Sequence, residues 1–433
     1  MSARATLSVA DFARAWTDLA RSPWRAAVVA AARERAIAVV GGALRDAALG
    51  RPVADVDLVI DGDGEAVARR IAANLPGRFV ALGGDRFGAY RIVGETIALD
   101  LWDRAGTSAI ADLARRDLTI GAIAMDLGSG EVLDPFAGRA DLAARVLRAT
   151  GPGVFQDDPL RVLRLARFAA ELEGFAVEPR TLELARAAAA GLESAAPERR
   201  RGELALLFAA PGAERGQAVL EAIGAWPACW TGTARAAAPS AVPVLEAIAR
   251  ITESSAASNA GGWTRARTAG SLAPIAATTE LAGLLEVVAG RGLVSRGERA
   301  DLERILSTPA SAPSDEVGLR REIHRLGYLW PQAFVLRAAT GSAEESDAWH
   351  EALAEARRLV ERAPEVLAPP RWLDGDAAAA ILGISPGPAL GAALADLTRA
   401  QVEGRVRSRA EAETHLAARA ATAKKANKEA GDE

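Results

Sequence analysis

The 433-residue sequence has one cysteine, three histidines and no strong excess of either charge. The single Cys229 excludes an intrachain disulfide framework and is compatible with a reducing compartment. Because 52 Lys and Arg face 56 Asp and Glu, the net charge of −4 gives no overall electrostatic footprint for nucleic acid. Lysine occurs only at Lys424, Lys425 and Lys428, so any RNA contact elsewhere must come from local arginine clusters.

Long apolar runs are also missing. The longest early run, 26–32, is closed by Arg25 and Arg33, which argues against an export signal, and nothing later approaches the length of a membrane span. We therefore expect a cytoplasmic protein without a membrane segment. Half of the residues are apolar, and Ala/Arg/Leu/Glu segments are frequent, so the chain can bury several cores that are mostly helical.

The texture of the sequence changes along the chain. Residues 36–150 contain short apolar strands and turns with a few short helices, which predicts an α+β fold with a mixed or antiparallel sheet. After residue 150 the apolar residues follow helical spacing. The expected segments are a helical leader packed on the next domain (1–35), the α+β domain (36–150), a first helical domain (151–225), a further helical region (226–420) and a frayed polar tail (421–433).

Four local predictions refine this division. Asp158-Pro159 is expected to open a helix, since Asp is a good N-cap and Pro suits a first turn. The Gly/Ser/Ala-rich stretch 254–272 is predicted to be a loop or linker. Residues 119–126 are predicted to form a strand, and 387–420 to be helical.

The most informative stretch is 36–61, AIAVVGGALRDAALGRPVADVDLVID. A strand that feeds Gly41 and Gly42 exposes backbone N–H groups at a bend, and such a concavity binds phosphate well. Asp55 and Asp57 alternate on the next strand, so both carboxylates point to one side of the sheet and can share divalent metal ions. A triphosphate cradle beside metal carboxylates suggests nucleotidyl transfer.

Other interpretations of this stretch are weaker. A calcium loop would need Asp or Asn where the chain has Val59 and glycine where it has Ile60. The dinucleotide-binding fingerprint needs a glycine spacing that Gly-Gly-Ala-Leu-Arg-Asp lacks. The alternative for Asp55 and Asp57 is that they lie on a solvated strand edge and bind no metal.

Three stretches resemble, in order, successive motifs of the bacterial class II tRNA nucleotidyltransferase and poly(A) polymerase family. They are VGGALRDAALGRPVADVDLVIDGD (40–63), RRDLTIGAIAMDLGSGEVLDPFAGRADL (115–142) and DDPLRVLRLARFAAELEGF (157–175). The resemblance covers roughly 36–225. It implies a polymerase-beta-type nucleotidyltransferase head, then a helical neck, body and tail, and metal-assisted transfer of a nucleotide from CTP or ATP to an RNA 3′ end.

The resemblance also implies roles for residues of the head. Asp55 and Asp57 match the family's Mg²⁺-binding carboxylates, where two metal ions would act together. Asp100 sits at the position of a third acidic residue, with Asp103 as a competitor for that role. The triphosphate pocket would be lined by the remaining matched head residues, which are Gly41, Gly42, Arg45, Asp46, Arg116 and Asp117. Arg45 and Asp46 could equally pair and brace the turn.

In the neck, Asp158 and Arg161 match the positions at which the family reads the Watson–Crick edge of the incoming base. Carboxylate and guanidinium offer complementary acceptors and donors, so small rotations could accept either C or A. Arg164 and Arg167 belong to the same nucleotide-binding motif, with a surface role as the alternative. For Asp158 the alternative is the helix N-cap.

Two departures from the family pattern affect the expected activity. Gly121 stands where the family usually has asparagine four residues after Asp117, which removes a hydrogen bond worth about 1 kcal/mol net. Only 101–114 separate the third carboxylate from the Arg-Arg-Asp block, and a short interval is associated with variants that add CC alone. We expect a tRNA CCA- or CC-adding enzyme, with a poly(A) polymerase or a catalytically impaired RNA-binding homologue as alternatives and the oligomeric state open.

Overall fold

The computed structural model describes most of the chain. The described residues are 14, 16–19, 21–33, 35–75, 77–82, 88–95, 97–104, 106–226, 228–231, 240–253, 266–273 and 281–429. They fall into two compact units, Met1–Arg235 and Ala236–Glu433, and each is described by itself.

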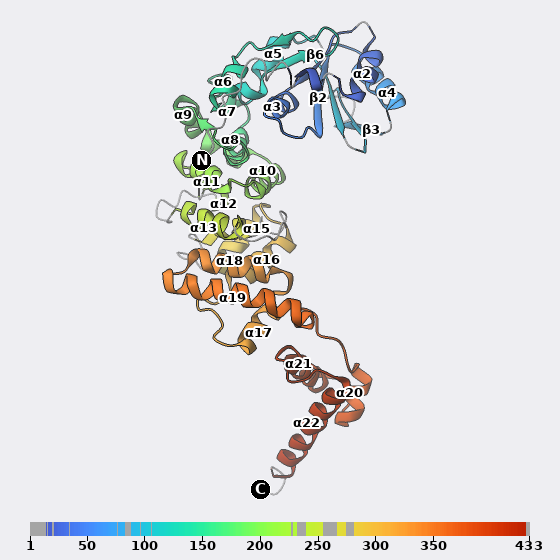
Figure 1. Ribbon diagram of the computed structural model, residues 1–433, viewed down its shortest axis with the longest axis vertical. Coiled ribbons are helices and arrows are strands. Elements are labelled where there is room, and N and C mark those ends of the chain that lie inside the picture. Colours follow the sequence, from blue (N-terminus) through green and yellow to red (C-terminus); the bar gives the residue numbers. More distant parts are fainter. Residues whose placement is uncertain are drawn as a thin grey trace. The chain divides into compact units, whose positions relative to one another are not determined.

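The first unit contains a mixed sheet of seven strands (Figure 1). In chain order these are β1 (Ile37–Val40), β2 (Asp55–Ile60), β3 (Arg78–Leu82), β4 (Ala89–Val93), β5 (Ala98–Asp103), β6 (Ala124–Asp126) and β7 (Val132–Leu133). Their spatial order is β3-β4-β5-β2-β1-β6-β7, and only β2 and β5 pair in parallel. The prediction of an α+β head with a mixed sheet is therefore confirmed.

Helices cover the sheet and hold the preceding segment against it. They are α2 (Pro23–Ala32), α3 (Gly42–Ala48), α4 (Gly64–Asn74), α5 (Ala109–Ala114), the 3₁₀ turn η2 (Thr119–Gly121) and α6 (Gly138–Ala144). Helix α4 buries Val67 and Ile71 completely and contacts β3, β4 and β5, while α2 packs on α4. The indole of Trp16 donates to the carbonyl oxygen of Leu44, 3.1 Å away. Residues 1–13 of the expected leader lie outside the described residues.

A small core on the other face fixes β1, β2 and β6. Its buried members are Val40, Val59, Leu113, Ala122 and Ala124. The strand predicted over 119–126 is wrong in its first half, because 119–121 form η2 and the strand starts at Ala124. The N–H groups of Gly121 and Ala122 donate back to the carbonyl oxygens of Leu118 and Thr119, both over 2.9 Å, so the backbone turns here instead of pairing as a strand. The Thr119 hydroxyl donates to Asp141 of α6 over 2.7 Å and ties the turn to that helix.

The rest of the first unit is helical. It comprises α7 (Val154–Asp157), α8 (Arg161–Glu171), α9 (Pro179–Ala188), η3 (Ala189–Ser194), α10 (Pro197–Ala209), α11 (Ala213–Ala222) and α12 (Ala228–Thr231), with a short parallel pair β8 (Val146–Leu147) and β9 (Ala176–Val177). Helix α8 packs between α10 and α11. Gly216 allows the closest approach, because a Cβ there would lie 2.7 Å from the carbonyl oxygen of Ala166.

The helix expected to open at Asp158 begins three residues later, at Arg161. Asp158 is extended (φ −145°, ψ 97°), and Leu160 occupies the N-cap position. The Asp158 carboxylate accepts a hydrogen bond from the Leu160 N–H at 3.2 Å, so it closes a local turn before the helix rather than capping it.

All of the secondary-structure elements described in the second unit are helices, joined by turns and short loops. Its elements are α13 (Val242–Glu253), α15 (Leu281–Gly290), α16 (Arg296–Leu306), α17 (Glu316–Leu326), η4 (Gly327–Leu329), α18 (Trp330–Thr340), α19 (Ala343–Arg362), η5 (Pro364–Val366), α20 (Gly375–Leu382), α21 (Pro388–Val402) and α22 (Arg409–Glu429). Capping boxes start α16 and α19, through Ser295 with Glu298 and Ser342 with Glu345. The fully buried Trp349 ring meets Phe334 edge-on, with 4.9 Å between centroids.

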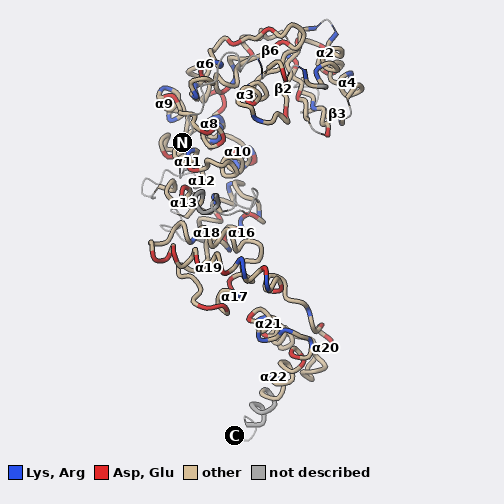
Figure 2. The backbone as a smooth tube through the Cα atoms, viewed as in Figure 1, with Lys and Arg blue, Asp and Glu red and all other residues tan. Residues whose placement is uncertain are grey.

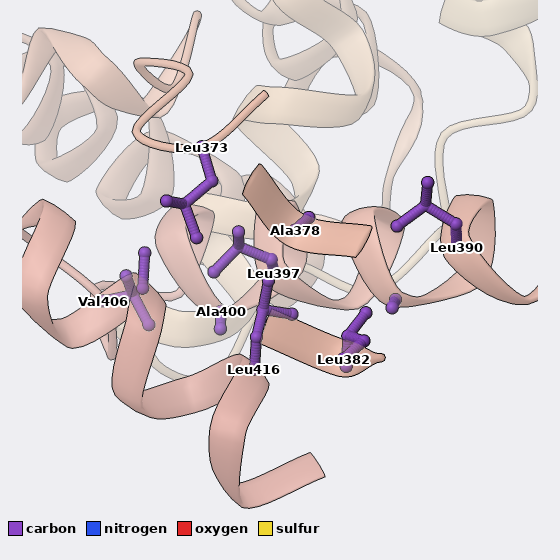
Figure 3. Close-up of a cluster of buried hydrophobic side chains, with 10 residues drawn as sticks. Leu373, Ala378, Leu382, Leu390, Leu397, Ala400, Val406 and Leu416 are labelled. Atoms are coloured by element: carbon purple, nitrogen blue, oxygen red, sulfur yellow. The ribbon is translucent and has the colours of Figure 1, made fainter. Parts of the chain in front are cut away.

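The last three helices share a separate apolar cluster (Figure 3). Leu382 of α20, Leu397 of α21 and Leu416 of α22 converge in it. The predicted helical stretch 387–420 is broken between α21 and α22, where Gly404 adopts φ +75°. Helix α22 then continues to Glu429, so the frayed tail expected from 421 is wrong over 421–429, where Ala, Lys and Glu favour helix.

The expected linker 254–272 is also corrected in part. Residues 254–265 lie outside the described residues, but 266–273 are helical. Ala266, Ala269 and Leu272 are fully buried at helical spacing, so packing overrides a loop-like composition.

Charge and hydropathy agree with the sequence-based expectations. Basic and acidic residues are interspersed along the backbone of both units (Figure 2). Within the described ranges, no helix combines the length and the apolar character that crossing a bilayer requires.

Candidate active site

The predicted carboxylates meet on one face of the sheet. Asp57 of β2 lies directly opposite Asp100 of β5 in the parallel register, and Asp55 precedes Asp57 by two residues on the same face. On the other side of Asp100, the antiparallel register brings Arg91 of β4 opposite it. The sheet therefore presents a row of acids with one arginine beside them.

Two arginines balance part of the negative charge of this row. Arg91 Nη2 lies 2.9 Å from Asp55 Oδ1, and its Nε lies 3.2 Å from Asp100 Oδ1. Arg116 Nη1 lies 3.8 Å from Asp57 Oδ2. Sequence reasoning missed Arg91, although an arginine at an alternate position of the strand AYRIV was the available signal.

The acids are held at an electrostatic cost. Burial raises the pKa of Asp57 above its ordinary value, Arg116 opposes that shift, and the neighbouring Asp55 adds to it. Burial likewise raises the pKa of Asp100 against the attraction of Arg91. Asp100 Oδ1 is buried without a well-aligned hydrogen bond, so its contact with Arg91 is an ion pair of poor hydrogen-bond geometry.

The competing acid, Asp103, performs a different task. Its two carboxylate oxygens accept hydrogen bonds from the N–H groups of Gly62, at 2.8 Å, and Gly64, at 3.0 Å. It pairs in register with Ile60, at the end of β2 away from Asp57. Asp103 therefore holds the turn that starts α4, and Asp100 is the residue in the acidic row.

The glycine bend after β1 lies against the same row. Gly41 adopts φ +74°, and a Cβ there would lie 2.6 Å from Arg116 Nη1 and 3.4 Å from Asp57 Oδ2. A side chain at this position would therefore intrude on the carboxylate and its arginine. Gly121, the departure from the family pattern, belongs to the same site because its carbonyl oxygen lies 3.6 Å from that Cβ position.

Arg45 and Asp46 pair with each other in the middle of α3. Two hydrogen bonds, of 3.1 and 2.8 Å, join the guanidinium to the carboxylate. The Arg45 guanidinium also lies 5.1 Å from the ring centroid of Phe168 on α8. This geometry favours the bracing role, and it links the bend to the neck.

The Arg-Arg-Asp block divides its residues between two tasks. Arg116 faces Asp57, whereas the buried Asp117 accepts a hydrogen bond of 2.6 Å from Arg164 Nε of α8 and one of 3.0 Å from the Leu118 N–H. Burial alone would raise the pKa of Asp117, but Arg164 and these hydrogen bonds hold it below its ordinary value.

The neck residues form a second group. Arg164 and Arg167 both approach the Glu203 carboxylate, at 3.5 and 2.9 Å, and both guanidiniums lie over the Phe168 ring. Burial raises the pKa of Glu203, opposed by Arg167 and then Arg164. Glu203 and Phe168 thus fix the positions of Arg164 and Arg167, and Arg164 also contacts Asp117 of the head.

Asp158 and Arg161 point to different partners. The Asp158 carboxylate lies 2.8 Å from Arg199 Nη2. Arg161 donates to the carbonyl oxygens of Val154, at 3.0 Å, and Arg115, at 2.5 Å. The predicted base-reading pair is thus held apart by separate contacts.

The carboxylate row suits a metal that its substrate helps to bind. In the part of the chain that the structure describes, no group of three or more His, Cys, Asp or Glu converges on one point. Asp55 and Asp57 nevertheless provide two carboxylates on one face. Mg²⁺ is commonly held by one or two carboxylates together with substrate phosphates, so the donor set fits that ion.

A separate hollow of about 480 Å³ lies on the opposite face of the sheet. Its walls include Leu19, Trp24, Ile92 and Leu99. Ile92 and Leu99 alternate with Arg91 and Asp100 along their strands, so this apolar space does not open onto the acidic row.

Comparisons with known proteins agree with this geometry. The family model described as "Poly A polymerase head domain" matches residues 37–101 and 101–148, and "Probable RNA and SrmB- binding site of polymerase A" matches 174–227. The chain is 35% identical over 398 residues to the "CC-adding tRNA nucleotidyltransferase" of Geobacter sulfurreducens, covering 87% of this chain and 90% of that relative. A "Multifunctional CCA protein" of Pseudomonas paraeruginosa is 39% identical over 199 residues, 43% of this chain and 48% of that relative.

Solved structures share the fold. A Bacillus stearothermophilus CCA-adding enzyme in complex with CTP has a TM-score of 0.72 and 25% identity, covering 93% of this chain and 99% of the other. A Thermotoga maritima CCA-adding enzyme complexed with tRNA has a TM-score of 0.64 and 21% identity, covering 94% and 98%. The resemblance of the motifs, the extended match to the Geobacter relative and the acidic row beside a glycine bend all agree, so this chain belongs to the tRNA nucleotidyltransferase and poly(A) polymerase family.

Proposed function

We propose that this protein adds C residues from CTP to the 3′ end of tRNA with Mg²⁺, with ATP as the further substrate of the CCA-adding alternative, and that it works in the cytoplasm. In each addition the RNA 3′ hydroxyl releases its proton to solvent and its oxygen forms a bond to the α-phosphorus, the bond from that phosphorus to the β-phosphate oxygen breaks, and pyrophosphate leaves. The observation that carries the proposal is the alignment of Asp55, Asp57 and Asp100 on one face beside Gly41.

Asp55 and Asp57 would hold Mg²⁺, and Asp100 would hold or position the 3′ hydroxyl beside them. Bound there, Mg²⁺ would supply acidification of that hydroxyl and neutralisation of the phosphates. Burial and repulsion between the carboxylates raise the pKa values of Asp57 and Asp100. A bound cation would offset that repulsion and stabilise both carboxylates in their charged form.

The remaining site residues would bind and orient the nucleotide. Arg116 is the phosphate or ribose ligand, since its planar guanidinium binds phosphate oxygens bidentately and it adjoins the Gly41–Gly42 bend. Arg45 and Asp46 brace that bend. Asp117 acts through Arg164, which it orients, and Arg167 completes the neck side of the pocket.

Asp158 and Arg161 would read the base edge of the incoming nucleotide. Asp158 would give up its contact with Arg199 and accept hydrogen bonds from the base instead. Arg161 would give up its backbone carbonyl partners and donate to the acceptors of cytosine or adenine. The exchange costs little for Asp158 because Arg199 is 55% exposed.

The domain division that we propose is the one expected from the sequence. It has a leader (1–35), a nucleotidyltransferase head (36–150), a neck (151–225), a helical body and tail (226–420) and a terminal segment (421–433). The head and neck would catalyse the transfer, and the body and tail would bind the rest of the tRNA.

The extent of addition is two C residues. The short interval 101–114 supports this, and so does the 35% identity over 87% of the chain to a CC-adding relative. A complete CCA-adding activity is the second candidate, because matched head and neck segments also occur in relatives named for CCA.

A primer series tests the function. Purified protein is incubated with Mg²⁺, each labelled triphosphate, and tRNAs that end before CCA, after the first C or after CC, plus an unrelated RNA. We expect C on the first two tRNAs and no A on the third. Added A on the third tRNA would establish CCA addition, long A tails on any RNA would establish the polymerase, and no incorporation would contradict the proposal.

The metal assignment is tested by Asp57→Asn. This variant should lose both transfer and direct Mn²⁺ binding measured by electron paramagnetic resonance, while tRNA affinity stays within a few-fold. Asp126→Asn is the matched control, since Asp126 lies in the same sheet but accepts hydrogen bonds from Ser129. Retained turnover in Asp57→Asn would show that the assignment is wrong.

A further inference from the structure

Among the described tryptophans, only the side chain of Trp102 is classed as exposed, whereas the others are buried or partly buried. Its exposed fraction is 43%. The described tryptophans that are buried, at 7% or less, are Trp16, Trp24, Trp226, Trp230, Trp330 and Trp349. A large aromatic side chain left in solvent at a defined place is a candidate contact surface.

The place of this indole is set by strand register. Trp102 follows Asp100 by two residues on β5, so both side chains stand on the same face, about 7 Å apart along the strand. On the β4 side its neighbour is Ala89, whose methyl group is too small to cover an indole. The uncovered ring therefore borders the acidic row.

Trp102 and the glycine bend lie on opposite sides of that row. Val40 is opposite Asp57 in the antiparallel β1–β2 pair, so Gly41 lies beyond Asp57 toward the start of β2. Trp102 is displaced from Asp100 in the other direction, toward the end of β5. In a displacement at phosphorus the attacking and leaving oxygens are roughly in line, so a triphosphate on the glycine side leaves the Trp102 side of the row for the RNA end.

The chemistry of the indole suits an RNA end at this point. Three carboxylates repel the phosphates of an approaching strand, whereas an uncharged aromatic face attracts a base without adding charge. Stacking tolerates every base, because each has a π face. An enzyme that adds successive nucleotides needs this tolerance, since its acceptor ends in a different base after the first addition.

We propose that Trp102 stacks on the 3′-terminal base of the acceptor RNA and thereby holds its 3′ hydroxyl at the acidic row. This inference rests on the proposed transfer to an RNA 3′ end. Trp102 is a binding residue for the acceptor, and it has no part in binding the triphosphate.

The experiment uses the full chain and a tRNA ending before CCA with 2-aminopurine as its terminal base. Binding to the wild-type protein should quench the 2-aminopurine fluorescence by stacking. Trp102→Leu should lose the quench and raise KM for tRNA roughly tenfold, with KM for CTP unchanged. Trp102→Phe should retain part of the quench, and Ile110→Ala, at another exposed apolar residue, should retain all of it.

The outcomes separate this inference from the proposed function. An unchanged quench and an unchanged KM for tRNA in Trp102→Leu would overturn the stacking role while transfer stands. A quench that depends on Trp102 in a protein that transfers no nucleotide would support stacking and contradict the function. A change confined to the oligomeric state, measured by sedimentation, would mean that Trp102 contacts protein, and the inference would fail.

Discussion

Arg164 Nε of α8 lies 2.6 Å from Oδ2 of the buried Asp117, and this ion pair joins the neck motif to the Arg-Arg-Asp block of the head. The two residues were expected to line one nucleotide pocket, and the structure makes them partners of each other. Arg116, the residue before Asp117, approaches Asp57. Because Arg116 and Asp117 are adjacent in the chain, the Arg164–Asp117 ion pair connects the neck to the acidic row.

Breaking this pair should destabilise the first unit. Because Asp117 is buried and Arg164 is about one third exposed, we expect Asp117→Asn or Arg164→Gln to cost roughly 2–4 kcal/mol in urea unfolding. The double variant should cost less than the sum, by about 1–3 kcal/mol. The control Arg180→Gln, in an exposed pair with Glu183, should change stability by less than about 0.5 kcal/mol. Additive effects at positions 117 and 164 would contradict the coupling.

The same pair predicts a pH dependence. The folded-state pKa of Asp117 lies below its unfolded value of about 3.9, so its contribution to stability is complete above that pH and is lost as the pH falls through the folded pKa. The difference in unfolding free energy between the wild type and Asp117→Asn should therefore be constant from pH 7 to about 5 and shrink below about 4. Urea titrations over this range measure it. A difference that grows on acidification would refute the assignment.

Gly41→Ala should impair the site more than the fold. The substitution strains a backbone at φ +74° and pushes Arg116 away from Asp57, so we expect KM for CTP to rise about tenfold, with a stability loss of about 1–2 kcal/mol. Gly50→Ala is the matched control, because Gly50 has φ +67° and open space around it. Equal kinetic losses in both variants would point to backbone strain alone.

Gly121→Asn tests the departure from the family pattern. Gly121 has no positive φ, and a Cβ there would meet only Asp117 Oδ1, at 3.9 Å, so the side chain fits. If the amide restores a hydrogen bond to the nucleotide, kcat/KM for CTP should rise about fivefold, corresponding to about 1 kcal/mol. Gly121→Ala should give no gain. A loss of activity in the asparagine variant with unchanged folding would mean that this pocket is built around glycine.

Asp158→Ala distinguishes base reading from a structural role. Base reading predicts a relaxed choice between CTP and ATP in single-turnover competition assays. Arg199→Ala removes only the ion-pair partner of Asp158 and should leave that choice intact. An unchanged preference in Asp158→Ala, accompanied by a lower melting temperature, would assign Asp158 to the turn that it forms with Leu160.

Most of the head was predictable from local pattern. Apolar runs and turns located the strands, and the alternation of Asp55 and Asp57 placed two carboxylates on one face because strand side chains alternate with period two. The start of α8 was misplaced, because the Asp158 carboxylate turns to Leu160 instead of capping the helix. The linker over 266–272 was mistaken because small apolar residues at helical spacing were outweighed by flanking Gly and Ser.

The sequence by itself determined the residue types of the site, the glycine bend after a strand and the order of motifs, since these depend on neighbours along the chain. Only the tertiary structure decided which residues meet. Strand register brought Asp100, and not Asp103, beside Asp57, and strand order added Arg91 from the next strand. The packing of α8 directed Arg164 to Asp117. Such pairings arise between segments far apart in sequence, where register and packing, which local propensity does not encode, set the distances.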